Sequence, residues 1–70
     1  MDRDHQQLIN EKGAAKTLSV ALQTLRNWRF QHTGPAYCKL NGGRAVRYRL
    51  SDLNAFINRN IIKTEDSHHE

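Results

Sequence analysis

Apolar residues near the start of the chain follow the spacing of a short helix. Ala14 and Leu18 lie one helical turn apart with Ala15 beside them, so the three share one face. Asn10 suits the N-cap position just before this stretch, and Glu11 suits the positive end of the helix dipole. We therefore predict a helix that begins near Asn10, and the small alanine side chains indicate that another helix packs closely against it.

A second helix is predicted from position 21 or 22 to position 30 or 31. Leu22, Leu25 and Trp28 recur along this stretch at helical spacing and define its buried face. Residues 33–35 end it, because they contain a glycine followed by a proline. Only a short turn separates the two helices, so the first half of the chain predicts a helix-turn-helix.

After this stop the pattern changes to strand-like alternation. Residues 36–40 and 45–49 alternate between apolar and polar side chains, and residues 41–43, Asn-Gly-Gly, form a hairpin turn signal between them. We predict a two-stranded hairpin with an apolar inner face and a basic outer face, packed on the helices because an isolated hairpin is marginal in water. The predicted apolar positions are Cys38 and Leu40 in one strand and Val46 and Tyr48 in the other.

One more helix is predicted after the hairpin. Ser51 suits its N-cap, Asp52 suits its dipole, and Leu53, Phe56 and Ile57 form its buried stripe.

The order of these elements predicts an α+β fold, a small winged helix-turn-helix, over residues 8–62. Residues 1–7 and 63–70 are polar and lack an apolar period, so we expect a flexible N-terminal arm and a flexible C-terminal tail.

Size limits what the chain can do. Seventy residues form one domain at most, and a chain of this length buries only about 60% of its unfolded surface, which leaves little room for a deep catalytic cleft. Cys38 is the only cysteine, and the sequence has no signal peptide and no apolar run long enough to span a membrane. These features fit a reducing cytosol, and we expect a cytoplasmic protein.

The net charge of +4 understates how basic the middle of the chain is. Residues 10–60 carry nine lysines and arginines against two acids, a net charge of +7. A charge of this sign attracts polyanions, and phosphate neutralisation is a common reason for it. A basic surface that only confers solubility is the alternative.

The outer face of the second helix carries side chains suited to reading DNA. Asparagine and glutamine can pair bidentately with adenine, and arginine can pair with guanine or hold a phosphate. Each residue alone fits an ordinary solvated position, but together beside a basic hairpin they favour DNA. The candidate residues are Gln23, Thr24, Arg26, Asn27 and Arg29.

The hairpin supplies a second set of candidate DNA contacts. Arg44 follows the turn and can reach the DNA backbone or a narrow minor groove. Lys39, Arg47 and Arg49 are expected to line the outer strand face. The alternative is that these charges only discourage edge-to-edge aggregation.

Metal binding and catalysis find little support. Cys38 has no second cysteine at ligand spacing, and the histidines at positions 5, 32, 68 and 69 form no ligand set. We therefore predict no enzyme, no metal and no cofactor. Trp28 is assigned to the core, and Tyr37 fits either inner packing or a phosphate contact.

The stretch from residue 9 to residue 57 resembles the AlpA-like and excisionase-like proteins of phages and mobile elements, a minimal branch of the MerR-type winged helix superfamily. The matching pieces cover about two-thirds of the chain in the right order, and the ordered set is more specific than any single piece. These pieces are Ala14-Ala15, Val20 and residues 24–28, 34–35, 39–44, 46–48 and 51–57.

The resemblance implies a recognition helix in the major groove and a wing on the minor groove. By position, Gln23 and Asn27 fall where excisionases read bases, Arg26 falls where they hold phosphate, and Arg44 falls on the wing tip.

Two positions depart from the family pattern. Family members usually carry an acidic residue in place of Gly13 and a serine or threonine in place of Ala21. Loss of the hydroxyl cap costs about 1 kcal/mol, and Ser19 is an alternative cap that would lengthen the second helix.

The resemblance implies sequence-specific binding of double-stranded DNA by a prophage or mobile-element protein, located in the bacterial cytoplasm and associated with the nucleoid. In an excisionase-like role, several copies bind side by side, bend DNA and direct a site-specific integrase toward excision. In an AlpA-like role, the same binding regulates a promoter. Two alternatives stay open: a protein-interaction module that uses Ile61-Ile62 and the acidic tail, and a DNA-packaging factor similar to small terminase subunits.

Overall fold

The computed structural model describes residues 7–63. The predicted arm and tail lie outside these residues, apart from Gln7 and Lys63 at their edges. Within the described part, no helix has the length and apolar character needed to cross a membrane. The elements, in chain order, are β1 (Leu8–Asn10), α1 (Glu11–Leu18), α2 (Leu22–Phe30), β2 (Cys38–Leu40), β3 (Ala45–Arg49) and α3 (Leu50–Arg59).

The first two helices form the predicted helix-turn-helix. The side chain of Asn10 accepts a hydrogen bond of 2.8 Å from the backbone N–H of Gly13, so Asn10 caps α1 as expected. Ser19 adopts the left-handed conformation at the end of α1, and its N–H donates to the carbonyls of Ala15 and Lys16. Ser19 therefore ends α1, and the alternative that it caps α2 is wrong.

The start of α2 is as weak as the sequence indicated. Ala21 occupies its N-cap position in an extended conformation and makes no side-chain cap bond.

Gly13, in the first turn of α1, lies close to the side chain of Ile9. A Cβ at Gly13 would lie 2.6 Å from Cγ2 of Ile9. A side chain in place of Gly13 would therefore displace Ile9.

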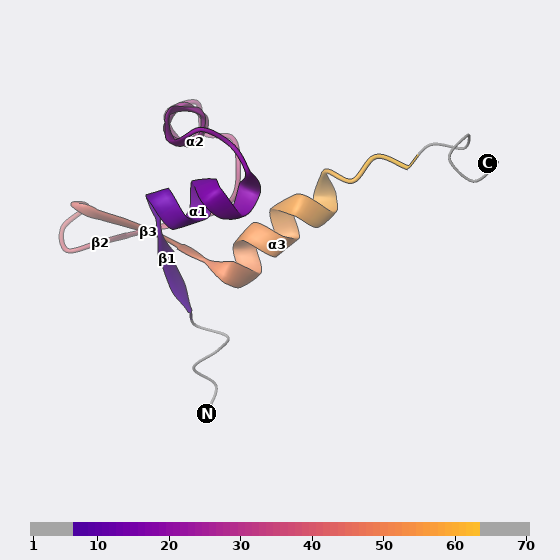
Figure 1. The fold of residues 1–70 in the computed structure, drawn as a ribbon. Helices are drawn as coiled ribbons and strands as arrows, with labels where there is room; N and C mark the ends of the chain where they lie inside the picture. Colours follow the sequence, from indigo (N-terminus) through magenta and orange to yellow (C-terminus); the bar gives the residue numbers. More distant parts are fainter. Residues whose placement is uncertain (1–6, 64–70) are drawn as a thin grey trace.

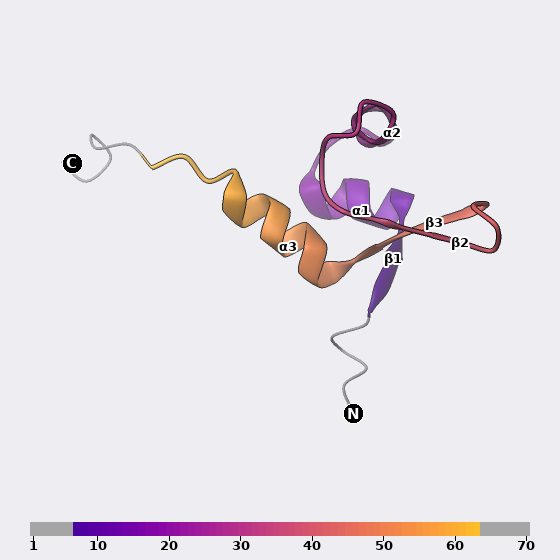
Figure 2. The same ribbon diagram turned by 180° about the vertical axis from the view of Figure 1, so that it is seen from behind.

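The sheet has three strands in the order β1-β3-β2, all antiparallel, rather than the two that were predicted. The added strand is β1, in which Ile9 pairs with Tyr48. Three residues are too few to show a strand period, so the sequence pattern could not reveal β1. As Figure 1 and Figure 2 show, the β2–β3 hairpin and α3 extend in opposite directions from the α1–α2 unit.

The register of the hairpin overturns the predicted facing of β2: Lys39 lies on the inner face instead of the outer one, and Cys38 and Leu40 lie on the outer face instead of the inner one. Lys39 pairs with Val46, and Cys38 pairs with Arg47. Because directly paired residues share a face of the sheet, Lys39 lies on the same face as Val46, not beside Arg47 and Arg49. Alternation within each strand was read correctly, but the turn sets how the two patterns align, and this register places Lys39 on the inner side.

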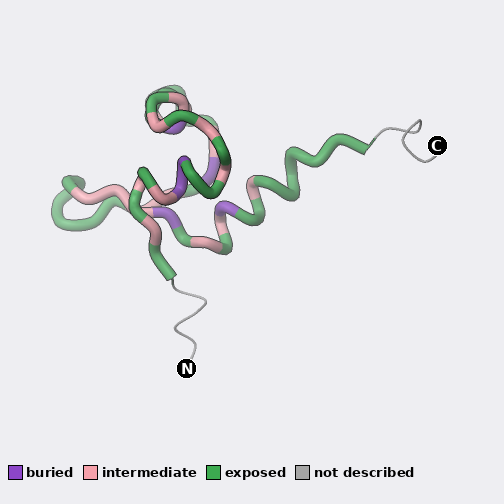
Figure 3. Tube along the Cα trace, in the orientation of Figure 1, coloured by how far each residue is buried: buried purple, intermediate pink, exposed green. Residues whose placement is uncertain are grey.

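The core lies where both helices of the motif meet β3 and the start of α3. Its buried residues come from all four elements, shown as purple segments in Figure 3. Leu25, Tyr48 and Leu53 are its largest members and are fully buried. The remaining buried members are Ala14 and Ala15, which confirms the close helix contact expected from their small size.

Helix α3 begins one residue before the predicted cap. The chain passes directly from β3 into α3, so Arg49 takes the N-cap position in an extended conformation and Ser51 lies inside the first turn. The prediction that Ser51 is the cap is therefore wrong. Leu53 is buried as expected, whereas Ile57 is 39% exposed, so the apolar stripe of α3 is only partly covered.

Gly34 is held against Trp28 after the end of α2. Its φ is +86°, and an added Cβ would lie 2.9 Å from Cβ of Trp28. Trp28 in turn packs on Phe56 of α3, with ring centroids 5.4 Å apart. The glycine therefore lets the chain turn back closely over the indole that joins α2 to α3.

We expect Gly34→Ala to lower the free energy of unfolding by about 2–3 kcal/mol, because it combines backbone strain with a steric clash. Gly42→Ala is the matched control, since Gly42 also has a positive φ of +67° but nothing within 4 Å of an added Cβ. The control should cost about 1–2 kcal/mol from strain alone. Urea titration measures the free energy of unfolding of both variants. Equal losses of this free energy would show that the contact between Gly34 and Trp28 is unimportant.

Candidate nucleic-acid interface

The outer face of α2 presents most of the predicted reading residues. Gln23, Arg26 and Asn27 are exposed, and Thr24 is half-buried. Leu25 lies on the opposite side of the helix and is fully buried in the core. The helix therefore buries one side against the domain and turns a polar side outward.

The two predicted base-reading amides lie next to each other. Nε2 of Gln23 donates a hydrogen bond of 3.0 Å to Oδ1 of Asn27, one helical turn further along. This bond uses Nε2 of Gln23 and Oδ1 of Asn27, so Oε1 of Gln23 and Nδ2 of Asn27 are not engaged in it, and both residues are exposed. An acceptor and a donor on one surface can address a base edge in the major groove.

Glu11 joins α1 to α2 through two arginines. Arg26 donates to both carboxylate oxygens of Glu11, at 3.3 and 3.0 Å, and Arg29 donates to one of them at 3.1 Å. The hydrogen bond from Arg26 is the largest influence and lowers the pKa of Glu11, helped by Arg29 and opposed by desolvation. Arg26 remains 47% exposed, so its outer surface stays open to a phosphate.

Arg29 occupies a more structural position than the sequence predicted. Its side chain is only 19% exposed, and it donates to Glu11 and to the hydroxyl of Tyr48, the latter at 3.3 Å. Its guanidinium lies 5.6 Å from the ring centroid of Tyr37, which packs on Tyr48. Arg29 thus links α1, α2 and the sheet, and Tyr37 belongs to the inner packing.

The three arginines of the β2–β3 hairpin differ in their exposure and in their hydrogen-bond partners. Arg44 is exposed at the end of the hairpin turn, where its backbone N–H donates to the carbonyl of Asn41. Arg47 is half-buried and donates to the carbonyl of Val46. Arg49 makes two hydrogen bonds to Asp52, at 2.7 and 3.0 Å, and these raise the pKa of its guanidinium.

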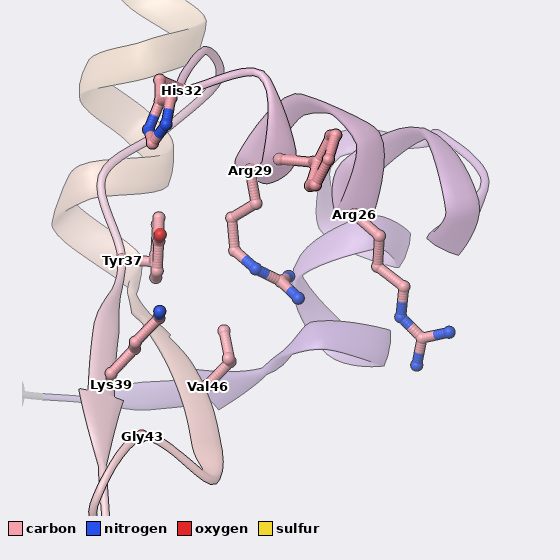
Figure 4. Close-up of a pocket in the computed structure, with 8 residues that line it drawn as sticks. Arg26, Arg29, His32, Tyr37, Lys39, Gly43 and Val46 are labelled. Atoms are coloured by element: carbon pink, nitrogen blue, oxygen red, sulfur yellow. The ribbon is translucent and has the colours of Figure 1, made fainter.

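A hollow of about 470 Å³ separates α2 from the hairpin. In Figure 4, Arg29 extends from α2 toward the hairpin, and Lys39 extends from β2 on the facing wall. Lys39 therefore lies across this hollow from α2. Arg26 extends toward the start of α1, where it binds Glu11. The lining residues are Arg26, Arg29, Phe30, His32, Tyr37, Lys39, Gly43 and Val46.

A second hollow lies on the other side of Arg26 and Val46, toward the start of α1. Lys12, Arg44 and Arg47 contribute to it, so cationic side chains flank α2 on both sides. Among residues 7–63, no group of three His, Cys, Asp or Glu side chains could hold a metal ion. The chemistry of this surface is thus that of amides and cations, which suits nucleic acid.

Sequence reasoning missed two members of this arrangement. Glu11 was assigned only to the helix dipole, and Tyr48 only to the inner face of the hairpin. Each contacts Arg29 across 18 or 19 positions of sequence, and no local pattern signals a contact over that separation.

Comparison with known proteins gives one family match. The sequence profile of a helix-turn-helix domain matches residues 12–61, which is most of the chain and contains both helices of the motif, the hairpin and α3. No curated protein and no solved structure matches the chain significantly.

Proposed function

The chain belongs to the helix-turn-helix domain family and is a DNA-binding protein of that family, and we propose that it recognises a specific sequence in double-stranded DNA. The family is typically non-enzymatic. In the proposal, α2 enters the major groove and the β2–β3 hairpin contacts the neighbouring backbone or minor groove.

One observation carries the proposal. The exposed face of α2 combines a hydrogen-bonded pair of amides with an arginine that borders two hollows, each lined by cationic side chains. Gln23 and Asn27 supply the amides, and Arg26 borders both hollows. Phosphate contacts fix the position of a protein on DNA, whereas amide contacts to base edges select the sequence. In the proposal, Gln23 and Asn27 read bases with help from Thr24, and Arg26, Arg44, Arg47 and Lys39 hold phosphates.

Arg29 and Arg49 take a supporting part in this proposal. Both are engaged within the domain, Arg29 with Glu11 and Tyr48 and Arg49 with Asp52. They add to the positive field of the surface, while their guanidinium groups hold the recognition helix and α3 in place.

We further propose that the protein serves a prophage or mobile element of a bacterium, in the cytoplasm, as an excisionase or an AlpA-like transcriptional regulator. The helix-turn-helix family includes proteins of both kinds, and the small size of the domain favours binding in several copies. A recombination assay with the integrase of the same element tests the first role, and a promoter fusion tests the second.

A protein-interaction module is the second candidate. Exposed isoleucines favour it: Ile61 is 58% and Ile62 is 84% exposed just after α3. If no duplex binds at low salt, this candidate replaces the first one.

Asn27→Ala is expected to relax base preference, because it removes an amide from the face of α2, while affinity for random duplex changes little. Arg44→Ala is the matched control: it should weaken binding to every sequence and reduce the slope of log affinity against log salt by about one. Footprinting and salt titration on specific and random duplexes measure both effects. Identical sequence preference in Asn27→Ala and the unaltered protein would contradict the assignment of Asn27.

A further inference from the structure

Phe30, the last residue of α2, is 85% exposed although it is one of only two phenylalanines in the chain. A single exposed apolar residue is ordinary on a protein surface. The position of Phe30 is what sets it apart. The other large aromatic side chains, Trp28, Tyr37, Tyr48 and Phe56, are buried or half-buried and pack in two aromatic pairs.

Helix geometry places Phe30 in the middle of the polar face of α2. At 3.6 residues per turn, Phe30 lies about 20° around the helix axis from Gln23, between the directions of Arg26 and Asn27. It lies about 10 Å further along the axis than Gln23, close to the rise of three base pairs. The same face therefore carries amides, a guanidinium and one apolar ring.

The surroundings of Phe30 are cationic. It lines the hollow between α2 and the hairpin together with Arg26, Arg29 and Lys39. An apolar ring flanked by these charges suits a ligand that is anionic at its edges and apolar at one point. Duplex DNA has this character in the major groove, where phosphates border the groove and the C5-methyl group of thymine is its apolar feature.

We propose that Phe30 contacts the C5-methyl group of a thymine in the major groove, and so makes the target site depend on a thymine near the end of α2. This inference rests on the proposed function and adds to it a contact that needs no hydrogen bond. The amides then select bases by their polar edges, and Phe30 selects a methyl group. The same contact accepts 5-methylcytosine, which carries its methyl at the same place.

The test replaces each thymine of a selected target duplex in turn with deoxyuridine, which lacks only the methyl group. We expect one position at which deoxyuridine weakens binding of the unaltered protein about fourfold, as for one buried methyl group. Phe30→Ala should weaken binding to the thymine duplex and lose the sensitivity at that position. With a C·G pair there, 5-methylcytosine should restore part of the affinity to the unaltered protein only.

Ile62→Ala is the matched control, because Ile62 is 84% exposed and lies outside the face of α2. It should keep the deoxyuridine profile unchanged. Because Phe30 is so exposed, Phe30→Ala should leave the urea midpoint of unfolding unchanged, which a urea titration measures.

The possible outcomes separate this inference from the proposed function. If Phe30→Ala keeps the full deoxyuridine profile, or if no thymine is sensitive in the unaltered protein, the methyl contact is wrong although specific DNA binding stands. If Phe30→Ala changes self-association in sedimentation but not the profile, Phe30 is a protein contact and the inference fails. If the unaltered protein prefers no sequence, the proposed function fails as well.

Discussion

Leu25→Ala is expected to lower the free energy of unfolding by about 2–5 kcal/mol, the largest effect of any single change considered for this protein. Leu25 is fully buried at the centre of the core, and its removal leaves a cavity that the surrounding α1, sheet and α3 can fill only partly. A domain of this size is stable by only about 3–10 kcal/mol, so the variant loses much of its total stability. Urea titration followed by circular dichroism measures the loss.

Leu40→Ala provides the matched control for this change. Leu40 lies in β2 and is 43% exposed, so the same chemical deletion should cost less than about 1 kcal/mol there. Equal losses at the two positions would mean that Leu25 is not the centre of the core. Because Leu25 also anchors α2, the variant should lose DNA binding at the urea concentrations that unfold it. It should keep DNA binding at the concentrations at which it is still folded.

Glu11→Gln is expected to lower the free energy of unfolding by about 1–2 kcal/mol at neutral pH. It removes the charge that holds Arg26 and Arg29 together on α2. The expected loss of stability is modest because Arg26 is 47% exposed, so solvent screens its ion pair with Glu11. Arg29, at 19% exposed, supplies most of the loss, since its guanidinium keeps only the hydroxyl of Tyr48 as a strong partner.

The effect of Glu11→Gln should depend on pH in a defined direction. The pKa of Glu11 is lowered in the folded protein, chiefly by the hydrogen bond from Arg26. The stabilisation is therefore complete above the unfolded pKa of about 4.3 and is lost as the pH falls through the lower folded pKa. Unfolding free energies of the variant and the unaltered protein should differ at pH 7 and converge in acid.

Asp52→Asn is the control for the acid titration. It breaks the ion pair with Arg49, which is 48% exposed and screened by solvent, so it should lower the free energy of unfolding less than Glu11→Gln does. A difference between Glu11→Gln and the unaltered protein that stays constant from pH 7 into acid would show that the charge of Glu11 does not stabilise the fold.

Local signals in the sequence were sufficient for most of the elements. The capping residue Asn10 and the glycine and proline after α2 mark helix ends, because caps and breakers act on the backbone beside them. Helical spacing identified Leu25 and Leu53 as core residues, and strand alternation identified Tyr48. The polar face of α2 follows from the same periodicity, so the candidate reading residues could be named before the fold was known.

The sequence by itself thus determined the helix-turn-helix, the hairpin and the polar face of α2, each of which depends on residues within about one or two turns of one another. Only the tertiary structure decided that Lys39 lines a hollow with α2, that β1 joins the sheet, and that Glu11 binds Arg26 and Arg29. The physical reason is that strand register and ion pairs between elements depend on how distant segments are brought together. Local pattern carries no information about that arrangement, which also decides which arginines are engaged within the domain, as Arg29 is, and which are exposed, as Arg44 is.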